Sequence, residues 1–400
     1  MTYVLTALLL CGCQPLAAHG PIPAETLEIH HYDDGESEYL HSCLDAFLFD
    51  GDALPSLTPQ GHEVEWKISS GHAAIDNHII HKTEGAAEYE PVSLSLTCRG
   101  QSVSFTGLTL NDPCVAYVIA YFSSEGNDKE QLKLAYTFNG EYWFKLNKDR
   151  GILRPSSGTR RLRDPSLVRR PGGGFSLLAT QGYDNDSIYV FDSDDLIAYE
   201  NERLLKLNAG NENTAMSGSE AWAPETFYDP DLHCYVILWS APSDGGIFYT
   251  LSSDLTDCTF PQRLNDPGYP VIDITMTRTS SGWTAIMKDE REPMEEYSQI
   301  VRGTGLSWYD LTAFESSLYD RHQVEGPAIM KSLEKDGWYV ILDDYTRSAY
   351  KLLYTDNIES GSFQELEDSS LMIPLEKPSH CSPLRVTWNE LDALIQALGE

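Results

Sequence analysis

Tyr235-Val236-Ile237-Leu238-Trp239 is one of five short apolar segments that recur along the chain after residue 114. The other four are residues 117–121, 175–179, 283–287 and 338–342. A second apolar segment follows each of them, at residues 132–136, 187–191, 247–251, 297–301 and 350–354. Short runs rich in β-branched and aromatic residues are typical of β-strands. Because internal repeats identify repeat architectures, this repeat decides the fold.

Each repeat ends near a leucine that follows a polar residue. These leucines are Leu146, Leu207, Leu264, Leu311 and Leu366, at intervals of 61, 57, 47 and 55 residues. Four-stranded blades around a central channel are the units of β-propellers, and a unit of about 54 residues has the size of one blade. We therefore expect an all-β chain in which residues 114–385 form a five-bladed β-propeller. Helically spaced apolar residues predict a C-terminal helix at 386–400.

The segment before the repeats also reads as short strands. Residues 63–68 alternate around Trp66, and apolar residues alternate again at 92–98, with turn residues between the runs. This spacing predicts a small β-sandwich at 25–111. The segment resembles the atypical bacterial immunoglobulin-like domains, in which a Trp strand precedes a Ser-rich turn and a further strand. Asn111-Asp112-Pro113 is the expected linker.

The first twenty residues have the pattern of a targeting segment. Val4 to Gly12 is apolar but far shorter than the roughly 20 residues that a membrane-spanning helix needs. We therefore expect a signal peptide at 1–20 and an exported protein, either periplasmic, at the cell surface or secreted. Leu10-Cys11-Gly12-Cys13 resembles a bacterial lipobox, so a lipid anchor at Cys13 is one alternative, and simple cleavage near Ala17-Ala18 is the other.

The charge balance limits the partners. The chain has 28 Lys and Arg against 61 Asp and Glu, a formal net charge of −33. Like-charge repulsion opposes binding to nucleic acid or to anionic lipid, whereas a neutral sugar is compatible with it. We expect a carbohydrate ligand, no nucleic acid, no membrane contact except through Cys13, and a monomer. The scattered cysteines predict no zinc site, although Cys43 and Cys98 could pair in an exported protein.

Three acidic residues interrupt or precede apolar strands in three different repeats: Asp164, Asp273 and Glu325. A charge at such a place costs desolvation free energy unless it faces a wet pocket. Corresponding positions of different blades point toward one end of the central channel. The three carboxylates are therefore expected to share one pocket.

The motifs around these residues resemble glycoside hydrolase family 43, five-bladed propeller enzymes that act on arabinose- and xylose-containing polysaccharides. In chain order the motifs are Arg163-Asp164-Pro165, Trp222-Ala223-Pro224-Glu225, Ile272-Asp273, Glu325-Gly326-Pro327 and His380. The resemblance implies that Asp164 is the general base and Glu325 the general acid. It implies that Asp273 orients Glu325 and raises its pKa. For an inverting reaction the base and acid carboxyls stand roughly 6.5–9.5 Å apart.

Further residues are expected at the substrate or in the channel. Trp222, Tyr183, Asp184 and Arg278 are candidates for sugar contacts, and Glu225 is either a pocket residue or a structural acceptor. His380 matches a channel histidine that in some relatives helps to hold calcium or water. Cys381 stands where relatives commonly have Gly. No cofactor is expected beyond a structural calcium. Residues 288–291 are interpreted as a solvated loop.

The expected function is an inverting glycosidase, of the α-L-arabinofuranosidase, arabinanase or β-xylosidase type, acting on plant cell-wall polysaccharide. One alternative is a non-catalytic carbohydrate-binding propeller. Such a protein would keep the fold but lose a carboxylate, and all three carboxylates are present here. A second alternative is a galactan-specific glycosidase of the same fold.

Overall fold

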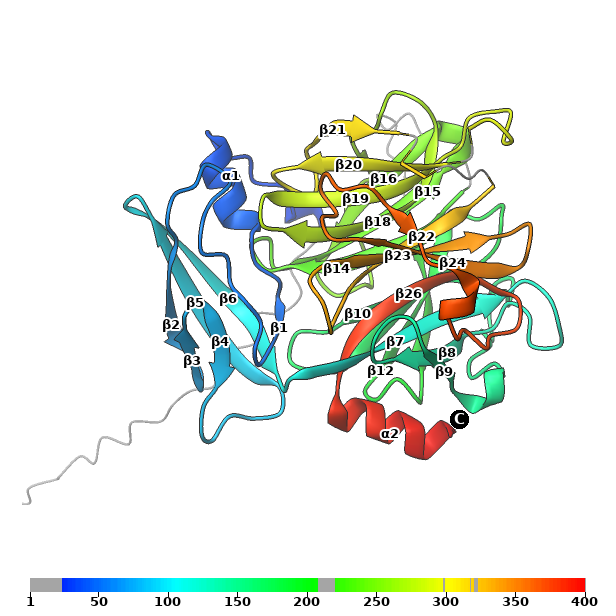
Figure 1. Cartoon of the computed structure of the whole chain (residues 1–400), viewed down its shortest axis with the longest axis horizontal. Helices are drawn as coiled ribbons and strands as arrows, with labels where there is room; N and C mark the ends of the chain where they lie inside the picture. The colour runs from blue at the N-terminus through cyan, green and yellow to red at the C-terminus, as the bar shows by residue number, and fades with distance from the viewer. Residues whose placement is uncertain (1–23, 208–219, 298, 317, 320–322, 400) are drawn as a thin grey trace, which may run out of the picture.

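The computed structural model describes residues 24–207, 220–297, 299–316, 318–319 and 323–399. The expected signal peptide and Cys13 lie outside these residues. No helix in the described part of the chain is both long and apolar enough to span a membrane. Strands dominate the structure, as expected (Figure 1).

Four consecutive four-stranded antiparallel sheets follow one another in chain order. The first sheet contains β10 (Arg163–Arg169), β11 (Phe175–Thr180), β12 (Ser187–Ser193) and β13 (Glu200–Lys206). The second contains β14 (Trp222–Asp229), β15 (Cys234–Ala241), β16 (Gly246–Ser252) and β17 (Gln262–Arg263). The third contains β18 (Val271–Thr279), β19 (Gly282–Asp289), β20 (Ile300–Gly305) and β21 (Leu311–Glu315). The fourth contains β22 (Glu325–Lys331), β23 (Trp338–Asp344), β24 (Ala349–Thr355) and β25 (Gln364–Glu365).

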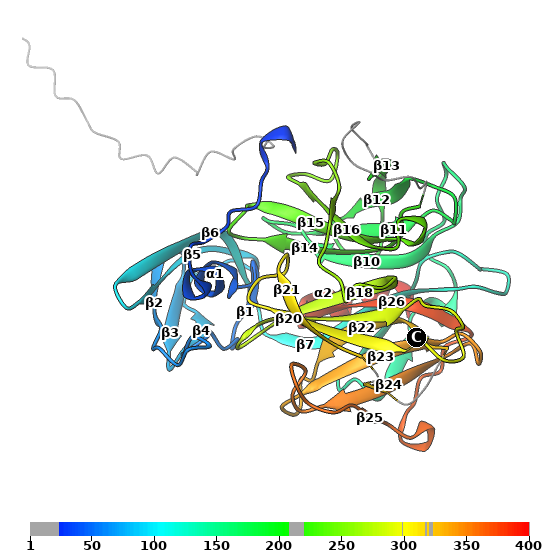
Figure 2. The same ribbon diagram turned by 90° about the horizontal axis from the view of Figure 1, so that it is seen from above.

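A further four-stranded sheet joins the two ends of this region. Its strand order is β26 (Pro378–Thr387), β7 (Cys114–Ser123), β8 (Lys133–Thr137) and β9 (Trp143–Lys145). The first strands of the five sheets contact one another in the closed order β10, β14, β18, β22, β26 and back to β10 (Figure 2). Pairing of a C-terminal strand with an N-terminal one closes the ring and leaves no long free edge. The all-β propeller prediction is confirmed.

The repeated apolar segments of the sequence are the second strands of these sheets. Each second strand lies between two neighbours, so most of its side chains are buried on both faces: β11 and β15 are buried along their whole length. Buried clusters fill the space between adjacent sheets, for example between β15, β16, β18 and β19. A strand covered on both faces has a continuous apolar sequence, which explains why this segment was the clearest repeat.

The first strand of each blade is irregular at its start. In β10, two residues stand opposite one residue of β11, between the pairs Arg163–Thr180 and Ser166–Leu178. The same bulge recurs in β14, β18 and β22. Its first bulged residue has positive φ in all four strands: Asp164 (45°), Ala223 (45°), Asp273 (55°) and Gly326 (53°). Bulges re-aim side chains and often lie beside functional sites.

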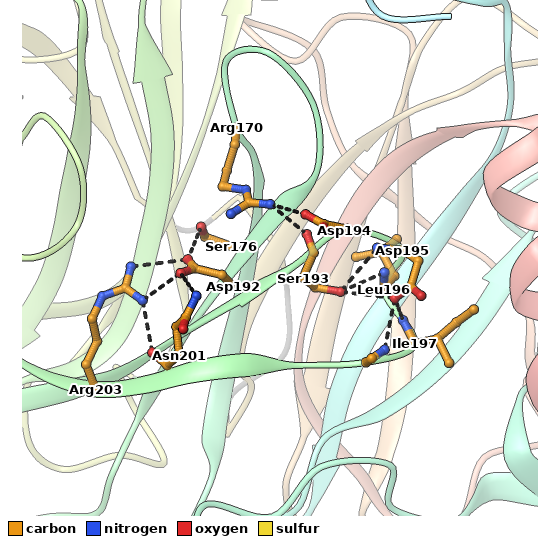
Figure 3. A network of polar contacts seen from close by, with 11 residues as sticks. Arg170, Ser176, Asp192, Ser193, Asp194, Asp195, Leu196, Ile197, Asn201 and Arg203 are labelled. Atoms are coloured by element: carbon orange, nitrogen blue, oxygen red, sulfur yellow. Dashed lines mark hydrogen bonds and ion pairs between the residues drawn. The ribbon is translucent and has the colours of Figure 1, made fainter. Parts of the chain in front are cut away.

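Many acidic residues hold blade edges together. In the first blade, Asp192 accepts hydrogen bonds from Arg203 of β13, at 3.0 and 3.2 Å, and from Asn201 (Figure 3). Arg170 pairs with Asp194, and Asp195 accepts the backbone N–H of Ile197 (Figure 3). These carboxylates stabilise the turns and the edge of the first blade.

The N-terminal region contains one four-stranded sheet and one hairpin. The sheet has the order β1 (Phe47–Phe49), β6 (Gln101–Asn111), β5 (Glu90–Cys98) and β2 (Glu65–Ser70), and β1 pairs with β6 in parallel. The hairpin is β3 (Ala73–Asp76) and β4 (Ile79–Lys82), and a short helix, α1 (Gly35–Ser42), packs on the same core. The resemblance to immunoglobulin-like domains stays a prediction.

This region lies beside the propeller (Figures 1 and 2). Its contacts with Arg278, near the last residue of β18, place it at the end of the propeller that is remote from the bulges. Arg385 of β26 makes two hydrogen bonds to Asp52, at 2.8 and 2.7 Å, and stacks on the ring of Phe49. Cys43 and Cys98 are free thiols, as are the other four cysteines of the described residues. The suggested Cys43–Cys98 pair is therefore wrong.

The C-terminal helix α2 spans Trp388–Leu398, inside the predicted range. Thr387 and Glu390 form a capping box at its start, and Leu391 and Leu394 are buried. Arg169 of β10 donates to both oxygens of Glu390 at 2.7 Å. The helix, which follows β26 directly, thereby ties this first strand of the closing blade to the first blade. Within the described ranges, four short 3-10 helices complete the elements: Ala24–Thr26, Asn147–Asp149, Pro242–Asp244 and Asp368–Ser370.

Candidate active site

A cavity of about 410 Å³ opens at the end of the channel where the bulges lie. It is lined by Asp164, Asp273 and Glu325, each from a different blade. The expectation that the three carboxylates meet in one pocket is therefore correct. The residues expected at the pocket that also line it are Trp222, Tyr183 and His380.

The bulges explain how the carboxylates reach this pocket. Asp164 and Asp273 occupy the same bulge position, one residue after the pairs Arg163–Thr180 and Ile272–Lys288. Glu325 stands one position earlier and is itself paired, opposite Asp343. The three acids are therefore not strictly equivalent. Asp164 and Asp273 reach the cavity because the bulge turns their backbone toward it. Glu325 has no bulged backbone, but its side chain is one methylene longer.

Asp273 connects the second and third carboxylate strands. Its Oδ2 accepts the backbone N–H of Gly326 at 3.0 Å, and its own N–H donates to Ser240 at 2.8 Å. Gly326 is the residue after Glu325, so this bond fixes the start of β22. Desolvation and the charge of Asp273 raise the pKa of Glu325.

Lys288 has the opposite effect and lowers the pKa of Glu325. Its buried Nζ lies 3.2 Å from Oε2 of Glu325 and 2.8 Å from Oε2 of Glu290. Burial lowers the pKa of Lys288, but the charges of Glu325, Asp273 and Glu290 outweigh burial and raise it. Lys288 is therefore a fixed positive charge beside Glu325, and it stabilises the ionised carboxylate.

An aromatic wall borders the acidic end of the pocket. Trp222 Nε1 donates to the carbonyl of Tyr183 at 2.7 Å, and the two rings meet edge to face. Arg163 lies over the rings of Tyr183 and Phe122. Because Arg163 already covers a face of Tyr183 and of Phe122, Trp222 is the better candidate for packing against the apolar side of a sugar ring. Asp184 is exposed on the same loop and does not line the cavity.

Glu225 connects the first strands of two neighbouring blades, β14 and β18, by hydrogen bonds. Its Oε1 accepts from Thr275 at 3.1 Å, and its carboxyl accepts the backbone N–H of Met276. At the same register, Ser166 accepts the backbone N–H of Thr226 in the next blade. Glu225 therefore replaces a hydroxyl in a chain of bonds between blades. Burial raises its pKa to about 7.

The structure corrects the expectation for Arg278, which lies outside the pocket. It lies near the opposite end of β18, donates to the carbonyl of Ser42, and pairs with Asp45 of the N-terminal region. Arg278 lies five positions after Asp273, and a strand advances roughly 3.3 Å per residue. One end of β18 thus contributes Asp273 to the pocket, and the other end contributes Arg278 to the interface with the N-terminal region.

His380 lies close to Asp164, with its Nδ1 3.9 Å from Oδ1 of that residue. The ring of His380 also leaves no room for a side chain at position 326, because a Cβ added to Gly326 would lie 2.8 Å from Cγ of His380. Among the described residues, no group of three His, Cys, Asp or Glu side chains is placed to hold a metal ion. The residues around His380 therefore do not fit the suggested calcium site.

Lys288, Glu290 and Asp343 line the pocket but were missed as functional residues. Lys288 ends the apolar run 283–287, and Asp343 ends the run 338–342. A charged residue directly after a continuous apolar run is the feature of the sequence that could have identified Lys288 and Asp343 as pocket residues. Residues 288–291 are not a solvated loop, because Lys288 and Asp289 are buried in β19.

Comparisons with known proteins assign the propeller region to a family. The family described as "Probable glycosyl hydrolase domain", related to glycoside hydrolase family 43, matches residues 112–392. An α-L-arabinofuranosidase from Bifidobacterium longum subsp. longum is 25% identical over 250 residues, 52% of this chain and 23% of that protein. The chain thus spans less than a quarter of the length of that relative.

Two solved structures show weaker similarity. An α-L-arabinofuranosidase from Lactobacillus brevis is 14% identical with a TM-score of 0.40, over 52% of this chain and 72% of that chain. A variant of a family 43 protein from Bacillus licheniformis is 11% identical with a TM-score of 0.45, over 69% and 56%. The family match covers the whole propeller and every motif in the pocket, so the chain belongs to this family of probable glycosyl hydrolase domains, which is related to glycoside hydrolase family 43.

Proposed function

We propose that the protein hydrolyses arabinofuranosyl or xylosyl linkages of plant cell-wall polysaccharides with inversion of configuration. The observation that carries this proposal is the meeting of Asp164, Asp273 and Glu325 in one pocket, with unequal surroundings. Glycoside hydrolysis needs one protonated carboxyl and one carboxylate at the same pH. The raised pKa of Glu325 suits the acid role.

The roles follow from these surroundings. Glu325 gives its proton to the leaving glycosidic oxygen while the C–O bond breaks. Asp164 takes a proton from the water that attacks the opposite face of the sugar. Asp273 holds the start of β22 through Gly326 and keeps a negative charge beside Glu325. Trp222, which lines the pocket and packs against Tyr183, supplies an aromatic surface for the sugar ring.

The substrate class is supported by charge as well as by family. Asp164, Asp273, Glu125 and Glu290 line the pocket, and two of its cations, Lys377 and Arg163, are paired with Glu125 and Glu130. Lys288 is already paired with Glu325 and Glu290. The pocket therefore disfavours uronic acids and favours neutral sugars.

Activity on nitrophenyl arabinofuranoside, nitrophenyl xyloside, arabinan, xylan and galactan tests the proposal, with product anomers followed by NMR. Asp164→Ala and Glu325→Ala should each reduce kcat by about 10²–10⁴-fold. Unchanged rates in both variants would overturn the assignment. Turnover of galactan alone would favour the galactan-specific alternative. Tight oligosaccharide binding by calorimetry without turnover would favour a binding propeller.

We also propose that residues 1–20 direct export. The apolar run Val4 to Gly12 and the lipobox-like Cys13 support this. Cell fractionation of the full chain and of Cys13→Ala is the test. A lipid-anchored protein moves from the membrane fraction to the soluble fraction on substitution, whereas a simply secreted one does not change. Retention of both forms in the cytoplasm would contradict export.

A further inference from the structure

Asp343 occupies a position that is used in the same way in several blades. It lies in β23 opposite Glu325, as Thr180 lies opposite Arg163 and Ser240 opposite Trp222. In each case, a side-chain oxygen accepts the backbone N–H of a bulged residue in the next blade. Thr180 accepts from Ala223 at 2.8 Å, Ser240 from Asp273 at 2.8 Å, and Asp343 Oδ2 from His380 at 3.3 Å.

A hydroxyl group is sufficient for this structural bond, as Thr180 and Ser240 show. Asp343 brings a second oxygen, Oδ1, which is buried and has no hydrogen-bond partner among the described residues. The residue is only 3% exposed. A buried polar atom without a partner is destabilising, and more so if it is charged. The second oxygen of Asp343 is therefore not explained by blade-to-blade bonding.

The position opposite Glu325 gives this carboxyl a neighbour to act on. Cβ atoms of directly opposite residues lie roughly 4.5–5.5 Å apart in antiparallel sheets. Two carboxyls at such a separation resist simultaneous ionisation. Lys288 donates to Glu325 and favours its ionised form, whereas the recorded partner of Asp343 is an uncharged backbone N–H. Burial, followed by the charge of Glu325, raises the pKa of Asp343 well above its usual range.

We propose that Asp343 is a neutral carboxylic acid whose O–H donates a hydrogen bond to the Glu325 carboxylate as that carboxylate forms during the reaction. This deepens the proposed function and rests on it. In that step the O–H bond of Glu325 breaks, and its proton bonds to the leaving oxygen, which keeps the electron pair of the broken C–O bond. The proton of Asp343 stays on Asp343. Asp343 is thus a positioning residue that acts through Glu325.

Several other groups face this pair and contribute to its titration. They are Asp164 of β10, Asp273 of β18, Lys288 and Glu290 at the end of β19, Tyr350 of β24, and His380 and Cys381 of β26. The variants that test the inference therefore leave all of these residues in place and change Asp343 alone.

Asp343→Ser and Asp343→Asn separate the two roles. Ser keeps an acceptor for His380, as Ser240 does for Asp273, but loses the acid. Asn keeps both an acceptor for His380 and a donor for Glu325. We expect Asp343→Ser to lower kcat about tenfold or more with little change in KM, because a hydrogen bond to a charged group is lost. Asp343→Asn should retain much more activity.

The pH dependence of kcat/KM shows in which direction Asp343 shifts the pKa of Glu325. An O–H that donates to the Glu325 carboxylate lowers the pKa of Glu325. In Asp343→Ser the basic limb of kcat/KM should therefore move to higher pH, by about one unit. Movement to lower pH would mean that wild-type Asp343 is ionised, and an unmoved limb with unchanged kcat would mean a structural role only. Either outcome overturns the inference.

A second measurement does not depend on activity. Infrared difference spectra of wild type against Asp343→Asn at pH 7 should show the loss of one protonated-carboxyl band. Asp344→Asn is the matched control, since Asp344 is the neighbouring buried residue and does not line the pocket. Loss of a carboxylate band instead would refute the neutral acid. If wild type cleaves no glycoside, the proposed function fails, and this spectrum still decides the protonation of Asp343.

Discussion

Asp273 accepts a hydrogen bond of 3.0 Å from the backbone N–H of Gly326, the residue that follows Glu325. One carboxylate thereby fixes the backbone that carries another, while its charge raises the pKa of the second. Asp273 thus has two separable effects on Glu325, one geometric and one electrostatic.

Asp273→Asn should separate them. The amide oxygen can still accept from Gly326, but the negative charge is gone, so the pKa of Glu325 falls. The basic limb of kcat/KM should move to lower pH, while thermal stability stays near that of wild type. Asp273→Ala loses the bond as well and should lower kcat further. Identical pH profiles for wild type and Asp273→Asn would contradict the electrostatic effect.

Lys288→Met should move the same limb in the opposite direction. The ammonium beside Glu325 stabilises its carboxylate, so removing that charge raises the pKa of Glu325. The basic limb should shift to higher pH. Lys288→Arg is the control, because it keeps the charge. An unmoved limb in Lys288→Met would show that Lys288 does not act on Glu325.

Gly326→Ala should destabilise the protein and reduce activity together. The backbone φ of +53° disfavours a side chain by roughly 1–2 kcal/mol, and a Cβ would approach Cγ of His380 to 2.8 Å. Gly172→Ala is the matched control, because its φ is +85° but no heavy atom lies within 4 Å of the added Cβ. Thermal unfolding and kcat are the measurements. Equal losses of Tm in the two variants would argue against the contact with His380.

Glu390→Ala should weaken the closure of the ring. It leaves the buried guanidinium of Arg169 unpaired, and breaking a buried pair typically costs about 3–5 kcal/mol. Asp186→Ala removes an exposed pair with Lys206 and should cost less than about 1 kcal/mol. Urea unfolding of both variants compares the two losses. Similar midpoints would show that the Arg169–Glu390 pair does not hold the first blade to α2.

The Arg169–Glu390 pair should also make the stability of the protein depend on pH in acid. Although burial opposes it, the hydrogen bonds and charge of Arg169 lower the pKa of Glu390 below its ordinary value of 4.5. Its contribution to stability is therefore present above pH 4.5 and is lost as the pH falls through the lowered value. In the Glu390→Ala variant this loss should be absent, so the stability difference from wild type should shrink in acid.

The sequence by itself determined the propeller and the order of its motifs. Continuous apolar runs mark strands buried on both faces, and this pattern is written in neighbouring residues such as 235–239. The acids Asp164, Asp273 and Glu325 could be found because each breaks such a local pattern. The same local view assigned Arg278 to the pocket, although β18 carries it to the domain interface.

Only the tertiary structure decided which residues face one another. The pairing of Glu325 with Asp343, the approach of Lys288, and the joining of β26 to β7 depend on strand register and on closure of the ring. These contacts link residues far apart in the chain, and a shift of one residue reverses the face to which each side chain points. Charge environment and proton placement are properties of those contacts, so they could not be predicted from composition or spacing.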